Sequence, residues 1–238
     1  MTDDRQRVLV VCAVDAEAKA VAAPFAAEDV HVGPLPAQRL ATPGGIVDVV
    51  VCGVGPAAAG AAAAYGLGAS AYDAVLSIGV AGAFAGGGAA IGGLVVADEI
   101  VFADLGVITN EGFTDIATVG FGDGLERVTP PAAGVTALHA RCAATAVPVV
   151  TGTILTLSTF TGTDARAAEL IAAHHAAAEA MEGSGVATAA SFAGVPAFEV
   201  RSISNPVGDR DREVWELPAA LAAITAASAA IFAEPLPL

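Results

Sequence analysis

Short β-branched runs alternate with alanine-rich stretches along the whole chain, and this alternation limits the fold more than any other feature. Six runs are short, apolar and bounded by Gly, Pro or Asp, which is typical of buried strands. They cover residues 8–14, 46–51, 74–78, 94–101, 147–157 and 195–203. Helices are expected over residues 15–27, 56–69, 135–146, 164–177, 183–193 and 218–232. The alternation predicts an α/β fold, a layered sheet with strands in mixed or parallel order.

The chain is expected to form one domain that spans residues 1–238. Its 238 residues suit one large domain or two small ones, and 55% of them are hydrophobic, which is enough for a full core. The sequence contains no repeat and no segment with the composition of a linker, so one domain is the simpler interpretation. The apolar content also excludes an intrinsically disordered chain.

Charge and cysteine content exclude several classes of function. The chain has 10 Lys and Arg against 25 Asp and Glu, a formal net charge of −15 at pH 7, and no basic stripe for nucleic acid. The uncharged stretches 49–72 and 74–97 have the length of a membrane span, but Gly, Pro and flanking acids argue against one. Three widely spaced cysteines in apolar runs favour a reduced, cytoplasmic protein.

Ligands of α/β sheets bind beyond the carboxyl ends of the strands, so residues after each run are candidates for a site. After the first run, Asp15 is expected to cap a helix and Glu17 to lie in its first turn. The same residues are as compatible with a simple helix start as with a catalytic role for Glu17. After the run 74–78, residues 79–82 (Gly-Val-Ala-Gly) either bring backbone amides close to a ligand or pack tightly.

A glycine turn at Gly53 and Gly55 precedes an alanine-rich helix and could cradle a phosphate or a dinucleotide. The motif is short, however, and a dinucleotide site needs an acid about twenty residues later, at the end of the next strand. Asp73 precedes that strand instead. The turn therefore favours dinucleotide binding only weakly.

Three later segments combine polar or aromatic residues with strand ends. Phe160, followed by Thr161, offers a ring that could stack on a base or belong to the core. Met181 could lie against a sugar ring, and Glu182 would otherwise be a first-turn helix carboxylate. Residues 201–211 (Arg-Ser-Ile-Ser-Asn-Pro-Val-Gly-Asp-Arg-Asp) are dense in polar groups in a chain that has few, which makes this segment the most informative.

Together and in this order, these segments resemble the nucleoside phosphorylase and nucleosidase superfamily. The most specific parts are Ala13-x-x-x-Glu17, Met181-Glu182-Gly183 and the stretch that begins Ser204-Asn205. Within the superfamily, the strongest resemblance is to the futalosine hydrolases, which are relatives of the methylthioadenosine/S-adenosylhomocysteine nucleosidases. The resemblance covers nearly the whole chain. It implies a three-layer α/β/α domain with a distorted mixed sheet, a homodimer or higher homo-oligomer, and no metal or organic cofactor.

The resemblance also implies roles for individual residues. Glu17 would activate the attacking water, and Glu182 would bind the ribose hydroxyls. Met181 would pack on the sugar and Phe160 on the purine. The residues implied to line the substrate site are Gly79, Val80, Ala81, Gly82, Phe160, Thr161, Met181, Glu182, Asn205 and Arg210. Glu17, Asn205 and Glu182 are the catalytic candidates.

Asn205 is a departure that bears on the substrate. Adenine-cleaving nucleosidases carry an aspartate at this position, where an aspartic acid can donate to N7 and accept from the 6-amino group. An ionised aspartate would repel the 6-oxo group of hypoxanthine, whereas an amide can donate to O6 and accept from a protonated N7. Asn205 therefore favours a 6-oxopurine such as the base of futalosine. Asp209 would be a second acid near the base, and it ranks below Asn205 as a candidate.

Charge separates hydrolysis from phosphorolysis. Breaking an N-glycosidic bond builds positive charge on the ribosyl ring, which nearby carboxylates stabilise. A phosphorylase needs arginines in its strand-end loops to hold phosphate, but Asp15 and Glu17 occupy the first loop and no Arg lies within residues 75–91. We therefore expect water to be the nucleophile. An adenine nucleosidase, a phosphorylase and a non-catalytic nucleotide or NAD-binding module that uses Gly53 and Gly55 remain alternatives.

The futalosine ribose carries a benzoate-bearing tail, and an arginine is its natural partner. Arg210 and Arg212 are candidates for this contact, although surface ion pairs with Asp209, Asp211 or Glu213 explain them equally well. The four histidines have no metal-ligand spacing. The expected partner is a small purine nucleoside, with no nucleic acid and no membrane.

Overall fold

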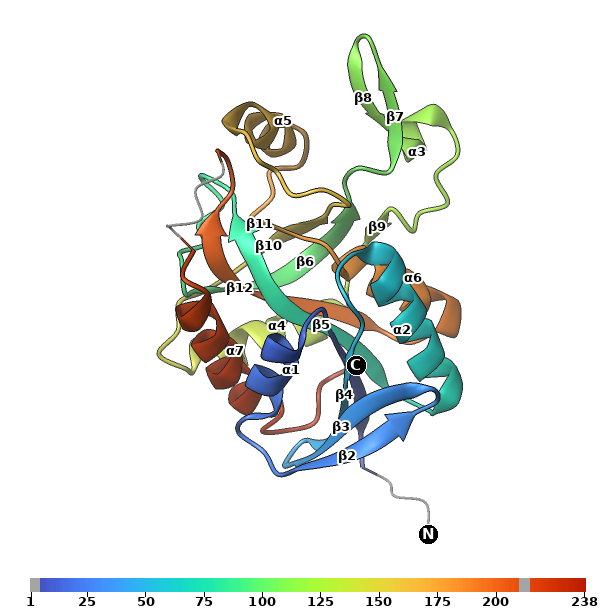
Figure 1. Ribbon diagram of the computed structural model, residues 1–238, viewed down its shortest axis with the longest axis vertical. Coiled ribbons are helices and arrows are strands. Elements are labelled where there is room, and N and C mark those ends of the chain that lie inside the picture. Colours follow the sequence, from blue (N-terminus) through green and yellow to red (C-terminus); the bar gives the residue numbers. More distant parts are fainter. Residues whose placement is uncertain (1–4, 210–214) are drawn as a thin grey trace.

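The computed structural model describes residues 5–209 and 215–238 and contains a ten-stranded mixed sheet covered by helices (Figure 1). The strands are β1 (Arg7–Cys12), β2 (Ala27–Val32), β3 (Leu35–Thr42), β4 (Gly45–Val51), β5 (Ala74–Ala83), β6 (Leu94–Phe102), β9 (Arg127–Val128), β10 (Val149–Thr156), β11 (Ala178–Ala180) and β12 (Ala197–Pro206). A separate hairpin consists of β7 (Gly106–Thr109) and β8 (Gly112–Asp115). The helices are α1 (Asp15–Ala22), α2 (Pro56–Ala69), α3 (Ile116–Val119), α4 (Ala132–Ala143), α5 (Asp164–His174), α6 (Gly183–Ala193) and α7 (Leu217–Ile231).

The sheet is mixed and strongly bent. Its strand order is β11-β10-β6-β12-β5-β1-β4-β3-β2, and β9 pairs with β6. Strand β5 is parallel to β1 and β12, whereas β12 runs antiparallel to β6. Strand β11 pairs with β10 on one side and with the far end of β5 on the other. This double pairing brings the carboxyl end of β5 beside β11. The sheet is therefore the distorted mixed sheet that the family resemblance implied.

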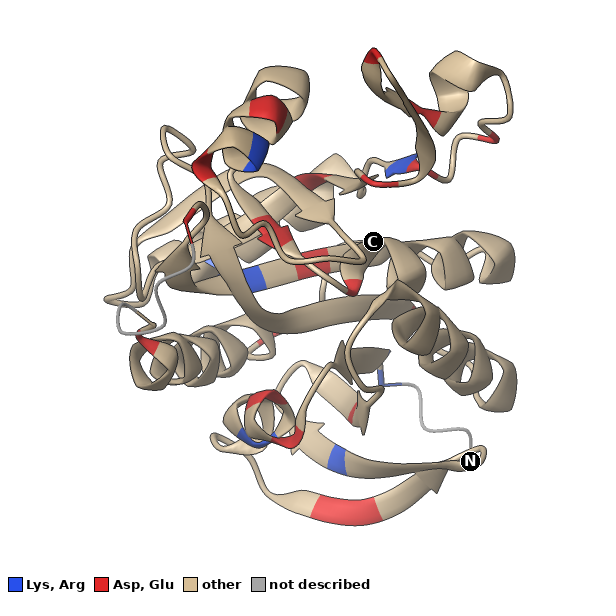
Figure 2. Ribbon diagram, turned by 45° about the horizontal axis from the view of Figure 1, so that its top comes forward, with Lys and Arg blue, Asp and Glu red and all other residues tan. Residues whose placement is uncertain are grey.

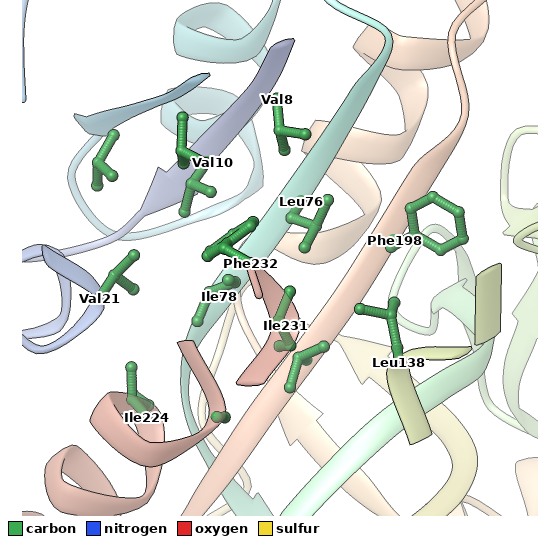
Figure 3. Packing of buried hydrophobic residues seen from close by; sticks show 14 of the residues in the cluster. Val8, Val10, Val21, Leu76, Ile78, Leu138, Phe198, Ile224, Ile231 and Phe232 are labelled. Atoms are coloured by element: carbon green, nitrogen blue, oxygen red, sulfur yellow. The ribbon is translucent and has the colours of Figure 1, made fainter. Parts of the chain in front are cut away.

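Two apolar clusters, one on each face of the sheet, hold the layers together. Alternate residues of one strand face opposite sides, so Val8 and Val10 belong to one cluster and Leu9 and Val11 to the other. Helices α1, α4 and α7 cover the first face, and α2 and α6 cover the second (Figure 1). Figure 3 shows Val8 and Val10 in the same cluster as Phe232, at the carboxyl end of α7. The predicted α/β/α layering is confirmed.

The predicted helices are confirmed, although several of their bounds are wrong. Residues 56–69 and 183–193 are helical as predicted. Helix α1 ends at Ala22 rather than at residue 27, and its N-cap is Val14, so the prediction of Asp15 as N-cap is wrong. Val14 has the extended backbone of a cap (φ −136°, ψ 158°), and its N–H donates to Glu17 Oε2. Asp15 is the first helical residue.

Strands β2 and β3 were missed, because their sequences lack a β-branched run. The segments read Ala-Glu-Asp-Val-His-Val and Leu-Pro-Ala-Gln-Arg-Leu-Ala-Thr, in which charged and small residues outnumber the apolar ones. They form a hairpin that extends the sheet antiparallel from β4. The elements β7, β8, β9, β11 and α3 were also missed, because each has only two to four residues. Strand β5 is longer than predicted and includes residues 79–82.

Acidic residues outnumber basic ones along the chain, as Figure 2 shows and as the composition requires.

The β7–β8 hairpin and α3 project from the body of the protein as an arm (Figure 1). Helices long and apolar enough to cross a membrane are absent from the described residues.

Candidate active site

One pocket lies where the carboxyl ends of β1, β5 and β12 meet β11, and it contains most of the predicted site residues. The predicted residues that line it are Glu17, Val80, Ala81, Gly82, Phe160, Thr161, Met181, Glu182 and Asn205. They come from segments far apart in the sequence that the mixed sheet brings to one edge. Arg210 and Arg212 lie outside the described residues.

Gly79 lies beneath the pocket rather than in its lining, which corrects the expectation that all of residues 79–82 face the ligand. A Cβ atom at Gly79 would lie 2.5 Å from Arg201 Nη1 and 2.6 Å from Glu17 Oε1. The absence of a side chain at this position therefore makes room for a charged group on each side.

Three backbone N–H groups hold the carboxylate of Glu17. Oε2 accepts from Ala13 at 2.9 Å and from Val14 at 3.2 Å, and Oε1 accepts from Val80 at 2.8 Å. A carboxylate has about four lone-pair positions, so one remains for a ligand or a water. Burial raises the pKa of Glu17 above its ordinary value, although Arg201 and the backbone donors act in the opposite direction.

Glu182 occupies the N-cap position of α6, and a single residue, Met181, separates it from the end of β11. Its Oε1 accepts from the Gly55 N–H at 3.1 Å, so the glycine turn after β4 contacts this acid. Its Oε2 accepts from Arg201 Nη1 at 3.1 Å and from the Met181 N–H at 3.4 Å. These bonds fix the carboxylate and leave Oε1 with a further lone pair for the pocket.

A buried arginine, Arg201, lies under the two acids. Its Nε donates to Glu199 Oε1 at 2.8 Å and its Nη2 donates to Ser77 Oγ at 2.7 Å, in addition to the bond with Glu182. Burial alone would lower the pKa of Arg201, but the surrounding carboxylates raise it above its ordinary value. The guanidinium is therefore always charged, and all three of its nitrogens have partners.

Asn205 is aimed into the pocket by an irregularity in β12. The register between β12 and β5 shifts between Ile203 and Asn205, which leaves Ser204 as an extra residue and pairs Asn205 with Gly82. Such bulges re-aim side chains at active sites. The Ser204 hydroxyl donates to Asn205 Oδ1 at 2.8 Å, and Asn205 Nδ2 donates to the Pro206 carbonyl at 2.9 Å. The second N–H of the amide remains for a ligand.

Two aspartates connect α5 to the segment after β12. The Asp164 N–H donates to Asp209 Oδ1 at 3.1 Å, and the Asp209 N–H donates to Asp164 Oδ1 at 2.9 Å. Asp209 also lines the pocket. The reciprocal bonds place this wall of the pocket relative to α5.

Sequence reasoning missed Glu179 and Trp215, which both line the pocket. Glu179 is a buried acid in the short strand β11, and an acid within an apolar segment was the available signal. Trp215 is the single tryptophan of the chain, but its distance from any predicted strand end gave no indication of a site.

The pocket is acidic in the part of the chain that is described. Within residues 5–209 and 215–238, no Lys or Arg side chain lines it, and the buried Arg201 is already bound to two carboxylates. The same residues contain no group of three or more His, Cys, Asp or Glu side chains that could hold a metal ion.

Comparison with known proteins identifies the family. The family model of the phosphorylase superfamily matches residues 7–236. The futalosine hydrolase of Streptomyces coelicolor is 47% identical over 233 residues, 92% of each chain. The futalosine hydrolase of Acidothermus cellulolyticus is 42% identical over 225 residues, 94% of this chain and 89% of its own. The structure of a methylthioadenosine/S-adenosylhomocysteine nucleosidase from Neisseria meningitidis superposes with a TM-score of 0.83 at 20% identity, over 96% of this chain and 99% of its own.

With its mixed sheet and strand-end pocket, the chain belongs to the phosphorylase superfamily. Superfamily membership alone is compatible with both phosphorolysis and hydrolysis. The identities of 47% and 42% over nearly the full length are more specific: within the superfamily, the chain belongs to the futalosine hydrolase family.

Proposed function

We propose that this protein hydrolyses the N-glycosidic bond of futalosine and releases hypoxanthine and dehypoxanthine futalosine, a step of menaquinone biosynthesis. The observation that carries the proposal is the convergence of Glu17 and Glu182 on one pocket. The membership in the futalosine hydrolase family supports the choice of substrate.

The sugar side of the reaction needs negative charge and a base. As the glycosidic bond breaks, positive charge develops on the ribosyl ring, and a carboxylate that is already oriented stabilises it at little reorganisation cost. Glu182, held by Gly55 and Arg201, is proposed to bind the ribose hydroxyls. Glu17 is proposed to take a proton from the water that attacks the anomeric carbon, because its remaining lone pair faces the pocket.

The base side of the reaction needs donors, because the leaving purine gains electrons. The Asn205 amide, with its oxygen held by Ser204, has one N–H available for O6 or N7 of hypoxanthine. Phe160 is proposed to stack on the base, and Met181 to pack on the sugar. Val80, Ala81, Gly82 and Thr161 complete the proposed nucleoside site.

Water is the proposed nucleophile. Phosphate would enter a pocket whose described lining carries Glu17, Glu179, Glu182 and Asp209 and no cation to balance it. The same acids favour a cationic transition state.

The test is chromatographic separation of products from futalosine, inosine, methylthioadenosine and adenosine, with and without phosphate. Hypoxanthine release from futalosine without phosphate is expected. Strict dependence on phosphate would instead identify a phosphorylase. Adenine release from methylthioadenosine at a comparable rate would identify an adenine nucleosidase.

Three finer proposals accompany this function. A cytoplasmic location fits the three free cysteines. A homodimer or higher homo-oligomer is proposed because two large apolar side chains are strongly exposed: Ile108 in the projecting arm (85% exposed) and Phe121 just after α3 (78% exposed). Such apolar surface favours contact with another protein surface. Arg210 is proposed to pair with the benzoate of the substrate tail, since it follows the pocket residue Asp209 directly.

A further inference from the structure

One buried acid of the pocket, Glu179, has no specific contact with the substrate in the proposed function. Glu179 is 6% exposed, and its Oε1 accepts the Thr161 N–H at 3.0 Å. Its Oε2 is buried without a hydrogen-bond partner among the described residues. Burial raises the pKa of the Glu179 carboxyl, although Thr161 acts in the opposite direction. Glu179 lines the pocket, and an unsatisfied buried oxygen at such a place indicates where a ligand supplies a donor.

The strand register places Glu179 near Asn205, at the end of the pocket that is proposed to hold the purine base. Gly82 of β5 pairs with Glu179 of β11 on one side and with Asn205 of β12 on the other. Neighbouring strands lie about 4.8 Å apart, so the Cα atoms of Glu179 and Asn205 are separated by roughly 10 Å. A Cβ atom at Gly82 would lie 2.8 Å from Val207 Cγ2, 3.2 Å from Asn205 Nδ2 and 3.7 Å from Glu179 Cγ. The side chains of Asn205 and Glu179 therefore lie on either side of Gly82, and all three residues line the same pocket.

A 6-oxopurine carries three polar groups along one edge: a donor at N1–H and acceptors at O6 and N7. Adenine has an acceptor at N1 and a donor at its 6-amino group instead. Asn205 supplies a donor suited to O6 or N7, and the free oxygen of Glu179 supplies an acceptor suited to N1–H. The Thr161 N–H could serve an N1 acceptor, but Glu179 already occupies it.

We propose that Glu179 selects the 6-oxopurine base by accepting a hydrogen bond from its N1–H, and that it disfavours adenine by presenting an acceptor to N1. This inference rests on the proposed function and names the second residue that reads the base. A site built to pair with one hydrogen-bond pattern rejects the opposite pattern strongly, because its own buried group is then left unpaired.

Glu179→Gln tests this proposal with little change in shape. The amide oxygen still accepts from Thr161, while the free oxygen becomes an NH2 group, which is a donor suited to the N1 acceptor of adenine. We expect kcat/KM for futalosine to fall about 10- to 100-fold. We expect kcat/KM for the counterpart of futalosine that carries adenine to fall less or to rise. The ratio of the two values should therefore decrease at least tenfold.

The matched control is Glu99→Gln, which removes an acid from a partly exposed ion pair with Arg127 and should leave the ratio unchanged. Equal losses for both substrates in Glu179→Gln would overturn the inference, because they would indicate a structural role only. Unchanged values would overturn it as well. Absence of hypoxanthine release by the wild-type protein would contradict the proposed function itself, which is a separate outcome.

Inhibition of the wild-type protein keeps the inference testable if the variant does not fold. Hypoxanthine and 1-methylhypoxanthine, which lacks N1–H, are compared as competitive inhibitors of futalosine hydrolysis. We expect inhibition by the methylated base to be at least tenfold weaker. Equal inhibition constants would show that no acceptor meets N1–H and would contradict the role of Glu179.

Discussion

Arg201 and Glu199 form a fully buried ion pair directly under the pocket, with Nε and Oε1 2.8 Å apart. The same guanidinium holds Glu182, so its removal would leave two buried carboxylates without their cation. Breaking a buried pair in this way typically costs about 3–5 kcal/mol of the free energy of unfolding.

Arg201→Met is therefore expected to lower the free energy of unfolding by about 3–5 kcal/mol, measured by chemical denaturation. Arg127→Met removes a partly exposed ion pair with Glu99 and should cost about 1 kcal/mol or less. Equal losses in the two variants would argue against a structural role for the buried pair.

Glu17→Gln is expected to reduce kcat for futalosine by about 10²- to 10⁴-fold, the usual contribution of a general base. The substitution keeps the size of the side chain, so it separates proton transfer from packing. Thermal denaturation checks that the variant is folded. A loss of activity below tenfold would leave Glu17 as a helix-start residue without a catalytic role.

The acidic limb of the pH profile should lie above pH 4.5, the ordinary value for a glutamate. Burial raises the pKa of Glu17, so its protonated, inactive form persists to a higher pH than for an exposed glutamate. Activity is thus retained above the raised pKa and lost as the pH falls through it. The measurement is kcat/KM for futalosine against pH. Glu179→Gln should keep this limb, because it leaves Glu17 in place, and a limb at or below pH 4.5 would contradict the assignment.

Asn205→Asp should reduce hypoxanthine release from futalosine about 10- to 100-fold, because an ionised carboxylate would meet O6 without a donor. The same change should raise adenine release from a 6-amino substrate relative to the wild type. Both rates can be measured by chromatography of the released bases. If neither rate changes, Asn205 does not contact the base.

Gly79→Ala should impair activity, because the added methyl group would lie within 2.6 Å of Arg201 Nη1 and Glu17 Oε1 and would displace one of them. We expect a loss in kcat of about tenfold or more, since small displacements of catalytic groups are costly. Gly68→Ala in α2 is the control, because a Cβ there meets nothing within 4 Å. It should keep full activity and gain about 0.5–1 kcal/mol in stability.

The sequence predicted the layers and singled out most of the residues that line the pocket, because both depend on local signals. Apolar β-branched runs identify buried strands, and the acids that follow them identify the pocket edge, as Glu17 illustrates. Glu182 and Asn205 were found through motifs that resemble a known family.

Long-range pairing accounts for what the sequence did not predict. Strand β11 has only three residues, and its pairing with both β10 and β5 depends on the bend of the whole sheet. Glu179 acquires its position from that pairing, and Arg201 acquires its partners from its own strand and from two other segments. Neither arrangement leaves a periodic pattern in the sequence.

The double pairing of β11 also affects self-association. Because β11 joins β10 to β5, the sheet curls back on itself at one end, and strand β2 forms its long open edge. Open edges recruit strands from other molecules, and charged side chains oppose such recruitment. The β2 edge carries the exposed acids Glu28 and Asp29. On this long edge, the fold thus places charges that repel a second copy.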